Sequence, residues 1–438
     1  MKLAPKRFSL LQAALFSGAL ATTASISLLM PGFSQSVRAA LQDSPKAVID
    51  EAWQIVNRDF VDPKFNRVDW QAARQELLGK NYTSRDEAYA ALRQALEKLD
   101  DPYTRFMDPK QYEALTSQTS GELTGVGMRL ELNEKTKTIT VAEPMENSPA
   151  IKGGIQAGDR ILSIDDKSTE GMTVADAAKL IRGPEGTKVR LRLGRESQPD
   201  LTLTLTRARI EVAAVRSNLR QEGQQRIGYI RLQEFSAHAG EQMQRAIVKL
   251  KEQKVDGFVL DLRGNPGGLL RVSIDIARMW MDTGAIVRTV DRQGDGQEMR
   301  ANRTAITNLP LVVLVDDNSA SASEILSGAL KDNKRATIMG TQTFGKALVQ
   351  SVHSLSDGSG LAVTIAHYYT PNGTDISHKG VTPDIKVELT DAQKRKLINK
   401  PSLIATPEDP YYSRALSVLK GNVGNRPATV KESMNILK

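Results

Sequence analysis

The sequence predicts a multidomain α+β protein in which a helical segment, a β-rich segment and an α/β core follow one another. Near the N-terminus, apolar residues recur every three or four positions, a spacing typical of amphipathic helices. Between 121 and 207 the apolar period changes to two, which favours strands. After 225, apolar strands alternate with helices, and this alternation indicates a largely parallel sheet.

Length and composition limit the possible classes of protein. The chain has 438 residues, of which 40% are hydrophobic, and is long enough for two or three domains with separate cores. It contains no cysteine, which excludes disulfides, a thiolate nucleophile and a Cys-ligated metal. We expect a C-terminal extension whose last twenty or so residues form a loose tail. The expected units are a leader, a helical region, a β domain, an α/β core and that extension, at 1–40, 41–118, 119–208, 209–391 and 392–438.

Residues 1–40 have the composition of a signal peptide. Basic residues precede an apolar stretch at 8–30, and small residues allow cleavage after Ala39 or Ala40. An uncleaved anchor is the alternative, because the apolar stretch nearly reaches spanning length. All four charges of this segment are positive, so half of the formal net charge of +8 lies there. The rest of the chain has no clustered basic surface, and no nucleic-acid role is predicted.

The helical region is predicted to hold three helices and a shorter fourth one. Acidic residues in the first turn of the third helix suit the helix dipole. The chain turns at Asp101-Pro-Tyr-Thr-Arg-Phe106, before the fourth helix, and we predict no chemistry in this region. The expected helices are 47–60, 70–78, 84–99 and about 111–115.

The β-rich segment begins with Gly-Val-Gly-Met running into an alternating strand at 125–132. Further strands, a helix at 174–181 and a Gly-Ile-x-x-Gly-Asp-x-Ile stretch at 154–161 follow. This order of elements and glycines resembles a PDZ domain, which captures a peptide as an added strand and holds its terminal carboxylate on backbone N–H groups. The alternative is a plain strand-entry turn. The resemblance implies a carboxylate-binding loop made of Gly125, Val126, Gly127 and Met128.

A serine cluster lies where a buried strand is predicted to turn into a helix. The apolar run 311–315 precedes it, and apolar residues at helical spacing follow. Ser321 would therefore lie at a helix start, where unpaired N–H groups and the helix dipole stabilise an anionic oxygen. The alternative is structural, because Ser321-x-x-Glu324 is also a capping box.

Lys346 follows Ser321 by 25 residues, after a second apolar run, within Thr341-Gln-Thr-Phe-Gly-Lys346. A serine and a lysine form a catalytic dyad only if the lysine is neutral, and a free lysine titrates near 10.4. Burial can lower this pKa by about 3 units at a cost of about 4 kcal/mol. Small and apolar neighbours are compatible with burial. The alternative is an ordinary solvated lysine.

The sequence offers two other possible chemistries. The loop Arg263-Gly-Asn-Pro-Gly-Gly268 follows a strand, but it lacks the Gly-Lys-Ser/Thr ending of a phosphate-binding loop. A better use is the Gly267 N–H pointed at a developing oxyanion, since glycine permits close approach. A Ser-His-Asp triad is the other alternative, but none of the four histidines lies in an evident motif. We expect His367 to be a packing residue of a strand at 361–368.

Taken together, these motifs resemble the carboxyl-terminal processing proteases, the tail-specific Ser/Lys endopeptidase family. The matching segments are 61–63, 101–106, the PDZ-like block, 261–268, 319–325 with 328–332, 344–346 and 380–385. The resemblance implies Ser321 as nucleophile, Lys346 as general base and Gln350 as the residue that orients the lysine. It also implies an oxyanion hole made by Gly267 and Ala322, with Gly268 as second choice, and supporting roles for Glu324 and Asp332.

The resemblance also implies partners and location. Family members need no metal or other cofactor, and they act on protein or peptide C-terminal tails, with membrane proteins among the candidate substrates and no nucleic acid. Some mature a photosystem II reaction-centre precursor, but these residues do not select that substrate. Together with the leader this predicts an exported protein of the periplasm or thylakoid lumen, membrane-associated if the leader is kept. The alternative is a PDZ adaptor with an inactive protease domain.

Overall fold

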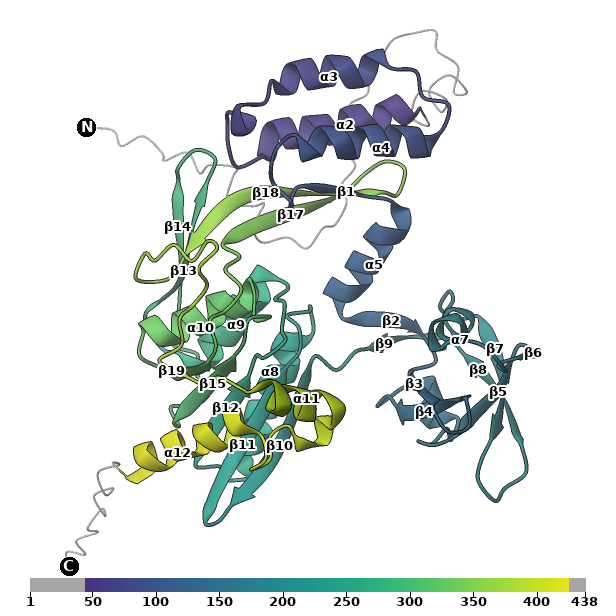
Figure 1. Ribbon diagram of the computed structural model, residues 1–438, viewed down its shortest axis with the longest axis vertical. Helices are drawn as coiled ribbons and strands as arrows, with labels where there is room; N and C mark the ends of the chain where they lie inside the picture. Colours follow the sequence, from purple (N-terminus) through teal and green to yellow (C-terminus); the bar gives the residue numbers. More distant parts are fainter. Residues whose placement is uncertain (1–43, 425–438) are drawn as a thin grey trace, which may run out of the picture.

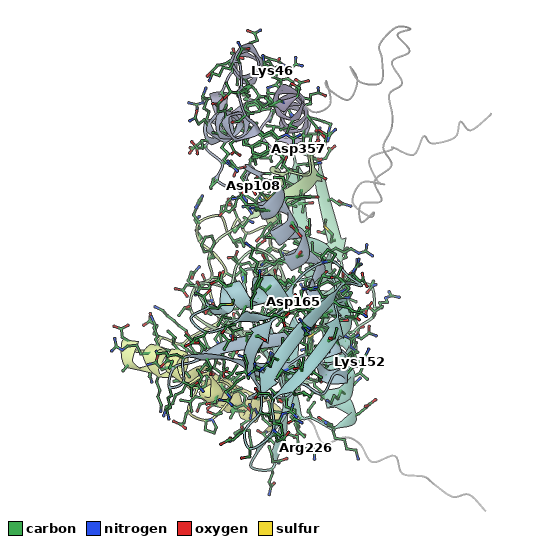
Figure 2. The ribbon with its side chains drawn as sticks, turned by 90° about the vertical axis from the view of Figure 1, so that its right-hand side faces the viewer. Lys46, Asp108, Lys152, Asp165, Arg226 and Asp357 are labelled. Atoms are coloured by element: carbon green, nitrogen blue, oxygen red, sulfur yellow. The ribbon has the colours of Figure 1, made fainter. Side chains whose placement is uncertain are left out.

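The chain folds into a stack of parts along one long axis, with a β-rich domain to one side (Figure 1). The computed structural model describes residues 44–424, so the expected leader lies outside the described residues. Figure 2 shows the stack from the side, with Lys46 in the helices at one end and Arg226 in the α/β core near the other. No helix between residues 44 and 424 is both long enough and apolar enough to cross a membrane.

Three helices form a bundle at one end, as predicted. Their apolar faces meet in a core in which the rings of Trp53 and Trp70 stack with centroids 6.4 Å apart. Each helix begins after a side chain that accepts a backbone N–H, which satisfies one otherwise unpaired donor. The helices are α2 (Pro45–Asp59), α3 (Trp70–Gly79) and α4 (Arg85–Glu97).

The fourth helix is longer than expected. It is α5 (Pro109–Ser120), whereas the sequence predicted a short helix at about 111–115. Asp108 and Gln111 form a reciprocal capping box at its start, and Gly121 ends it in the left-handed conformation. This helix leads from the bundle towards the β-rich domain (Figure 1).

A two-stranded ribbon connects the β-rich domain to the rest of the protein. It consists of β2 (Glu122–Gly125) paired with β9 (Ala208–Glu211). Its own sheet has the order β3-β4-β5-β7-β8, which places β3 (Met128–Asn133) at an edge. The helix α7 (Val174–Ile181) contributes to the same apolar core. The remaining elements are β4 (Thr138–Pro144), α6 (Pro149–Lys152), β5 (Arg160–Ile164), β6 (Lys167–Ser168), β7 (Lys188–Gly194) and β8 (Leu201–Thr206).

The α/β core contains a six-stranded sheet in the order β10-β11-β12-β15-β16-β19. All neighbours from β11 onwards are parallel, as predicted, and only β10 is antiparallel. Apolar helices cover one face of this sheet. The strands are β10 (Val215–Glu222), β11 (Gln225–Leu232), β12 (Gly257–Asp261), β15 (Leu311–Val315), β16 (Thr337–Gly340) and β19 (Ile385–Lys386). The covering helices are α8 (Ala239–Glu252), α9 (Leu270–Trp280) and α10 (Ala322–Asp332).

The C-terminal segment covers the opposite face of the sheet, which corrects the expected loose tail as far as Gly424. The helix α12 (Pro410–Gly424) packs against alternate strand residues such as Val259 and Val312. Tyr412 and Leu419 are fully buried there, because a parallel sheet is covered on both faces. A shorter helix, α11 (Asp391–Asn399), precedes it. Residues 425–438 lie outside the described residues.

A second sheet connects the helical bundle to the core. It pairs β1 (Arg105–Met107), β17 (Leu348–Ser354) and β13 (Ala285–Asp291) with the long strand β18 (Gly360–Tyr369), and β14 (Gly296–Arg300) extends it. His367 corrects another expectation, because it is exposed and does not pack. Near this end of β18 a register shift in β17 accompanies inward-facing Ala366 and Tyr368, so His367 faces outwards.

Candidate active site

Ser321 lies at the turn from β15 into α10, as the sequence predicted. Its backbone has φ 53° and ψ −112°, a sparsely populated region for a residue with a side chain. Such a conformation persists only where the surroundings over-determine it. One of the two hydrogen bonds of the capping box is formed, since the Ser321 N–H donates to the Glu324 carboxylate over 2.8 Å.

The glycine-rich loop after β12 is hydrogen-bonded to the serine turn along its length. The Ser319 hydroxyl donates to the Leu262 carbonyl over 2.9 Å, and the Gly264 N–H donates to Asp316 over the same distance. The Asn265 carbonyl accepts a further N–H from Ala320, at 3.1 Å. These contacts join the carboxyl ends of two adjacent parallel strands into one rigid edge.

Gly267 lies directly against the serine. Its φ is +106°, and a Cβ at this position would lie 2.9 Å from the Ser321 Cβ and 3.0 Å from the Ala322 nitrogen. Only glycine fits there. The Gly267 N–H, however, donates to the Asn265 side-chain oxygen over 2.9 Å, so this predicted oxyanion donor is already hydrogen-bonded in this structure. The second choice, Gly268, has φ +141° and lies against the Phe235 carbonyl.

Glu324 connects the serine turn to the lysine loop. Its carboxylate is fully buried. One oxygen accepts the Thr343 hydroxyl at 2.6 Å and the Gly345 N–H at 2.7 Å. The other accepts the Ser321 N–H at 2.8 Å and the Lys346 N–H at 3.0 Å. Burial raises the pKa of Glu324, and these four hydrogen bonds act in the opposite direction.

Lys346 is half-buried beside this carboxylate but does not direct its amine at it. The amine lies over the Tyr103 ring, 4.6 Å from the ring centroid. Burial lowers the pKa of Lys346, and the charge of Arg105 lowers it further. Asp101 and Glu324 act in the opposite direction through space. The alternative of an ordinary solvated lysine is therefore not what the structure contains.

Tyr368 is a site residue that the sequence analysis missed. Its hydroxyl lies within hydrogen-bonding distance of the Lys346 carbonyl and 3.2 Å from the Ser321 carbonyl. Ser321 and Lys346 therefore share two anchors, the Glu324 carboxylate and the Tyr368 hydroxyl. Thr343 was missed too, although it lies within the stretch 341–346 that was singled out. A buried tyrosine on a strand carries no such local signal.

Two predicted site residues, Gln350 as the residue that orients the lysine and Asp332 as a supporting residue, lie apart from this network. The Gln350 side chain donates to the Thr364 hydroxyl over 3.2 Å. Asp332 lies at the far end of α10, where it accepts the Thr370 hydroxyl at 2.6 Å and the Asn372 N–H at 3.0 Å. Asp332 therefore fixes the chain after β18 and does not touch the serine turn.

The predicted carboxylate-binding loop lies in the β-rich domain, next to the edge strand β3. Val126 is buried, and its carbonyl accepts the Ala150 N–H at 2.8 Å. Gly127 has φ +78°, and a Cβ there would lie 2.3 Å from the Ser148 Cβ. Gly125 and Met128 end and begin the flanking strands. The loop is thus fixed in shape, and an unpaired strand edge follows it.

No group of three or more histidine, aspartate or glutamate side chains in residues 44–424 is arranged to hold a metal ion. The two histidines with carboxylate partners pair outside the serine turn: His238 lies 3.0 Å from Glu122, and His353 lies 3.5 Å from Asp59.

Comparisons with known proteins match both the α/β core and the β-rich domain. Peptidase family S41 matches residues 226–387, and the PDZ domain matches residues 140–195. The carboxyl-terminal-processing protease of Synechocystis sp. is 43% identical over 85% of this chain and 86% of its own length. The chloroplastic carboxyl-terminal-processing peptidase 2 of Arabidopsis thaliana is 42% identical over 76% of this chain and 67% of its own length.

A solved structure gives the same result. The photosystem II D1 C-terminal processing protease is 39% identical, with a TM-score of 0.51 over 79% of this chain and 93% of that one. The identity to the relatives exceeds what is needed to assign a family, and both the protease core and the PDZ domain are matched. The chain therefore belongs to the family of carboxyl-terminal-processing proteases, serine-type hydrolases with an S41 core and a PDZ domain.

Proposed function

We propose that Ser321 and Lys346 form the catalytic dyad that cleaves a polypeptide near its C-terminus. One observation carries this proposal: a single oxygen of Glu324 accepts the backbone N–H of both residues, at 2.8 and 3.0 Å. An atom that binds the backbone of both residues fixes the separation of the two backbones from which the hydroxyl and the amine extend. Glu324 itself is not the base, because its oxygens are occupied by neutral donors.

The chemistry follows from the environment of the amine. Neutral Lys346 takes the Ser321 hydroxyl proton as the serine oxygen attacks the substrate carbonyl, and the resulting ammonium returns a proton to the leaving amine. Water then releases the acyl group. The Ala322 N–H at the start of α10 stabilises the oxyanion, with Gly267 as its partner once its N–H leaves Asn265. Gln350, four residues after Lys346 in the sequence, orients the lysine.

The substrate is a protein tail captured by the PDZ domain. The loop 125–128 presents backbone N–H groups to a terminal carboxylate, and β3 offers a free edge for an added strand. The similarity to the solved photosystem II D1 C-terminal processing protease supports a photosystem II reaction-centre precursor as the first candidate substrate. Membrane proteins are the wider class of candidates. The leader and the same relatives support export to the periplasm or thylakoid lumen.

The test is C-terminal mapping of a candidate substrate after incubation with the purified protein. We expect Ser321→Ala and Lys346→Arg each to abolish cleavage while the thermal transition is kept, because arginine retains the charge but cannot become neutral. Lys394→Ala, at an exposed position of α11, is the matched control and should cleave normally. Tail binding without hydrolysis by the intact protein would instead favour a PDZ adaptor with an inactive protease domain. Cleavage by Lys346→Arg would disprove the dyad.

A further inference from the structure

The stretch Asp101–Phe106 joins the helical bundle to β1, and the sequence predicted no chemistry there. Its middle residue, Tyr103, is half-buried, and its ring lies under the Lys346 amine at 4.6 Å. The proposed dyad gives Tyr103 no role. Three sets of contacts show how the fold holds Tyr103 beside the amine.

The surroundings hold the Tyr103 backbone firmly. Asp101 accepts the Tyr103 N–H at 3.1 Å and the Thr104 hydroxyl at 2.6 Å, so the turn is closed on itself. The Thr104 oxygen then accepts the Thr364 N–H from β18 at 3.0 Å, and both of these residues are buried. From Arg105 onwards the segment pairs with β18 as a strand.

The same strand also holds the other side of the lysine. β18 contributes Tyr368, whose hydroxyl contacts the Lys346 carbonyl, and it pairs with β17 immediately after the lysine loop. The backbone of Lys346 and the turn that carries Tyr103 are therefore both fixed to β18. Their contact is a property of the fold.

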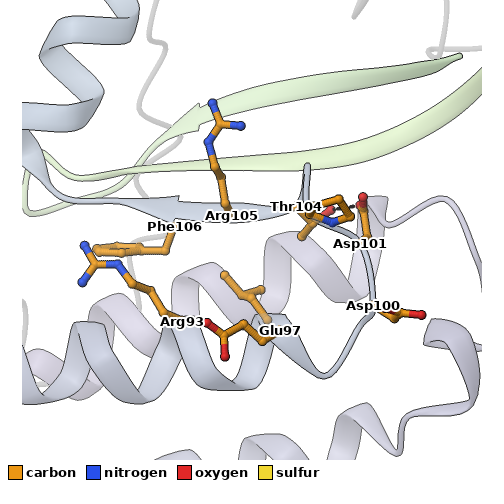
Figure 3. Close-up of a pocket in the computed structure, with 9 residues that line it drawn as sticks. Arg93, Glu97, Asp100, Asp101, Thr104, Arg105 and Phe106 are labelled. Carbon is orange, nitrogen blue, oxygen red and sulfur yellow. Dashed lines mark hydrogen bonds between the residues drawn. The ribbon is translucent and has the colours of Figure 1, made fainter. Parts of the chain in front are cut away.

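The segment that carries Tyr103 also borders a cavity. Asp101, Pro102, Thr104 and Arg105 line a cavity of about 510 Å³ against α4, whereas the side chain of Tyr103 does not. Figure 3 shows this cavity between the turn and the helix. Tyr103 instead contacts the lysine, and its ring covers one side of the amine.

We propose that Tyr103 is a positioning residue of the catalytic centre, whose ring shields the Lys346 amine from water and fixes its location. This proposal rests on Lys346 being the base, as proposed above. It gives a function to the segment between the helical bundle and the protease core, and makes that segment one wall of the active site.

The effect of the Tyr103 ring on the pKa of Lys346 depends on the other groups around the amine. Tyr103, Asp101 and Arg105 come from this segment, Glu324 from α10 and Tyr368 from β18. Burial is the largest influence and lowers the pKa of Lys346, and Arg105 lowers it as well. Burial also raises the pKa of Tyr103, so its phenol stays neutral at neutral pH. An aromatic face attracts an ammonium, which opposes the effect of shielding.

The experiment compares the pH dependence of kcat/KM in three Tyr103 variants. Tyr103→Phe keeps the ring and should match the wild type. Tyr103→Ala admits water, so its acid limb should move to higher pH by about one unit, which is about a tenfold loss below the limb. Tyr103→Leu keeps the shielding without the π face, so its limb should move to lower pH. Arg105→Gln should move it to higher pH, independently of the ring.

The control is Tyr82→Ala, a half-buried tyrosine of the helical bundle whose hydroxyl donates to the Leu77 carbonyl. It should lower stability without moving the limb. Should Tyr103→Ala not fold, Tyr103→Ser, which also admits water, carries the test, and a wild-type limb there would overturn the proposal. A wild-type limb in Tyr103→Ala, or an equal shift in Tyr103→Phe, would overturn it as well. Failure of the dyad itself is distinct, because Lys346→Arg would then cleave.

Discussion

Two buried carboxylates, Asp261 and Glu324, lie next to the glycine-rich loop and the serine turn. The protein stabilises these two carboxylates in different ways. Asp261, at the end of β12, is fully buried and contacts Arg263 at 2.6 Å. Arg263 also contacts Asp409, which precedes α12, at 2.8 Å. Burial alone would raise the pKa of Asp261, but the guanidinium outweighs it, so this pKa is lowered.

Glu324 is equally buried but its hydrogen-bond partners are a hydroxyl and three backbone N–H groups. Burial therefore prevails, and the pKa of Glu324 is raised. An ion pair between Glu324 and the Lys346 amine would keep that amine charged. Instead the carboxylate binds the lysine through its backbone. The comparison teaches that the glycine-rich loop is fixed by permanent charge, whereas the serine–lysine side is fixed without a counter-charge, as a lysine base requires.

The largest expected effect on stability comes from removing the guanidinium that pairs with Asp261 and Asp409. Arg263→Met would leave two fully buried carboxylates unpaired, which costs about 3–5 kcal/mol. We expect a large fall in the melting temperature of the core and detachment of α12, seen as faster hydrogen exchange at 410–424. Arg192→Met breaks an exposed pair with Asp200 and should leave both unchanged. Wild-type stability in Arg263→Met would mean that the ion pairs of Arg263 with Asp261 and Asp409 do not hold the glycine-rich loop.

Glu324→Gln tests the carboxylate that is held by hydrogen bonds alone, and it should have a smaller effect on stability. The amide nitrogen would face N–H donors on one side, which costs about 1–3 kcal/mol. We expect kcat to fall further than this instability explains, because Ser321 and Lys346 lose their common anchor. Asp256→Asn removes a carboxylate that accepts a backbone N–H at the opposite end of the sheet, and it should keep kcat. Equal kcat in both variants would contradict the anchoring role.

The smallest effect is a gain in stability from Lys346→Met. Because the folded pKa of Lys346 is lowered, the unfolded chain binds more protons, and stability rises with pH between the folded and the unfolded pKa. Below that window the charged amine destabilises the fold at full strength. The variant should therefore melt higher than the wild type at neutral pH, and the gain should shrink as the pH approaches about 10.4. Lys394→Met should show no gain, and no gain in Lys346→Met would show that the amine is well solvated.

Sequence reasoning predicted the parts of this protein that depend on local patterns. Ser321 at a helix start and the parallel sheet followed from apolar spacing and turn residues. The strand β14 was missed because its residues are polar and exposed. The helix α12 did carry a signal, since Tyr411, Tyr412, Ala415, Leu416 and Leu419 have helical spacing, but the polar composition around them hid it.

The electrostatics of the site depend on contacts across the chain and could not be predicted. Nothing near Lys346 in the sequence indicates that Tyr103, more than two hundred residues earlier, would cover its amine. Likewise, the Gly267 N–H is bonded to Asn265 for reasons of loop geometry that a glycine motif does not specify. Residue identity predicted the chemistry, but the fold determines which groups meet.

The most direct test of the central claim, that Lys346 is a neutral base for Ser321, is the pH dependence of kcat/KM for a peptide substrate. The account predicts an acid limb well below the ordinary lysine value of about 10.4, and no measurable turnover at any pH in Lys346→Arg. An acid limb at about 10.4, or turnover by the arginine variant, would contradict it.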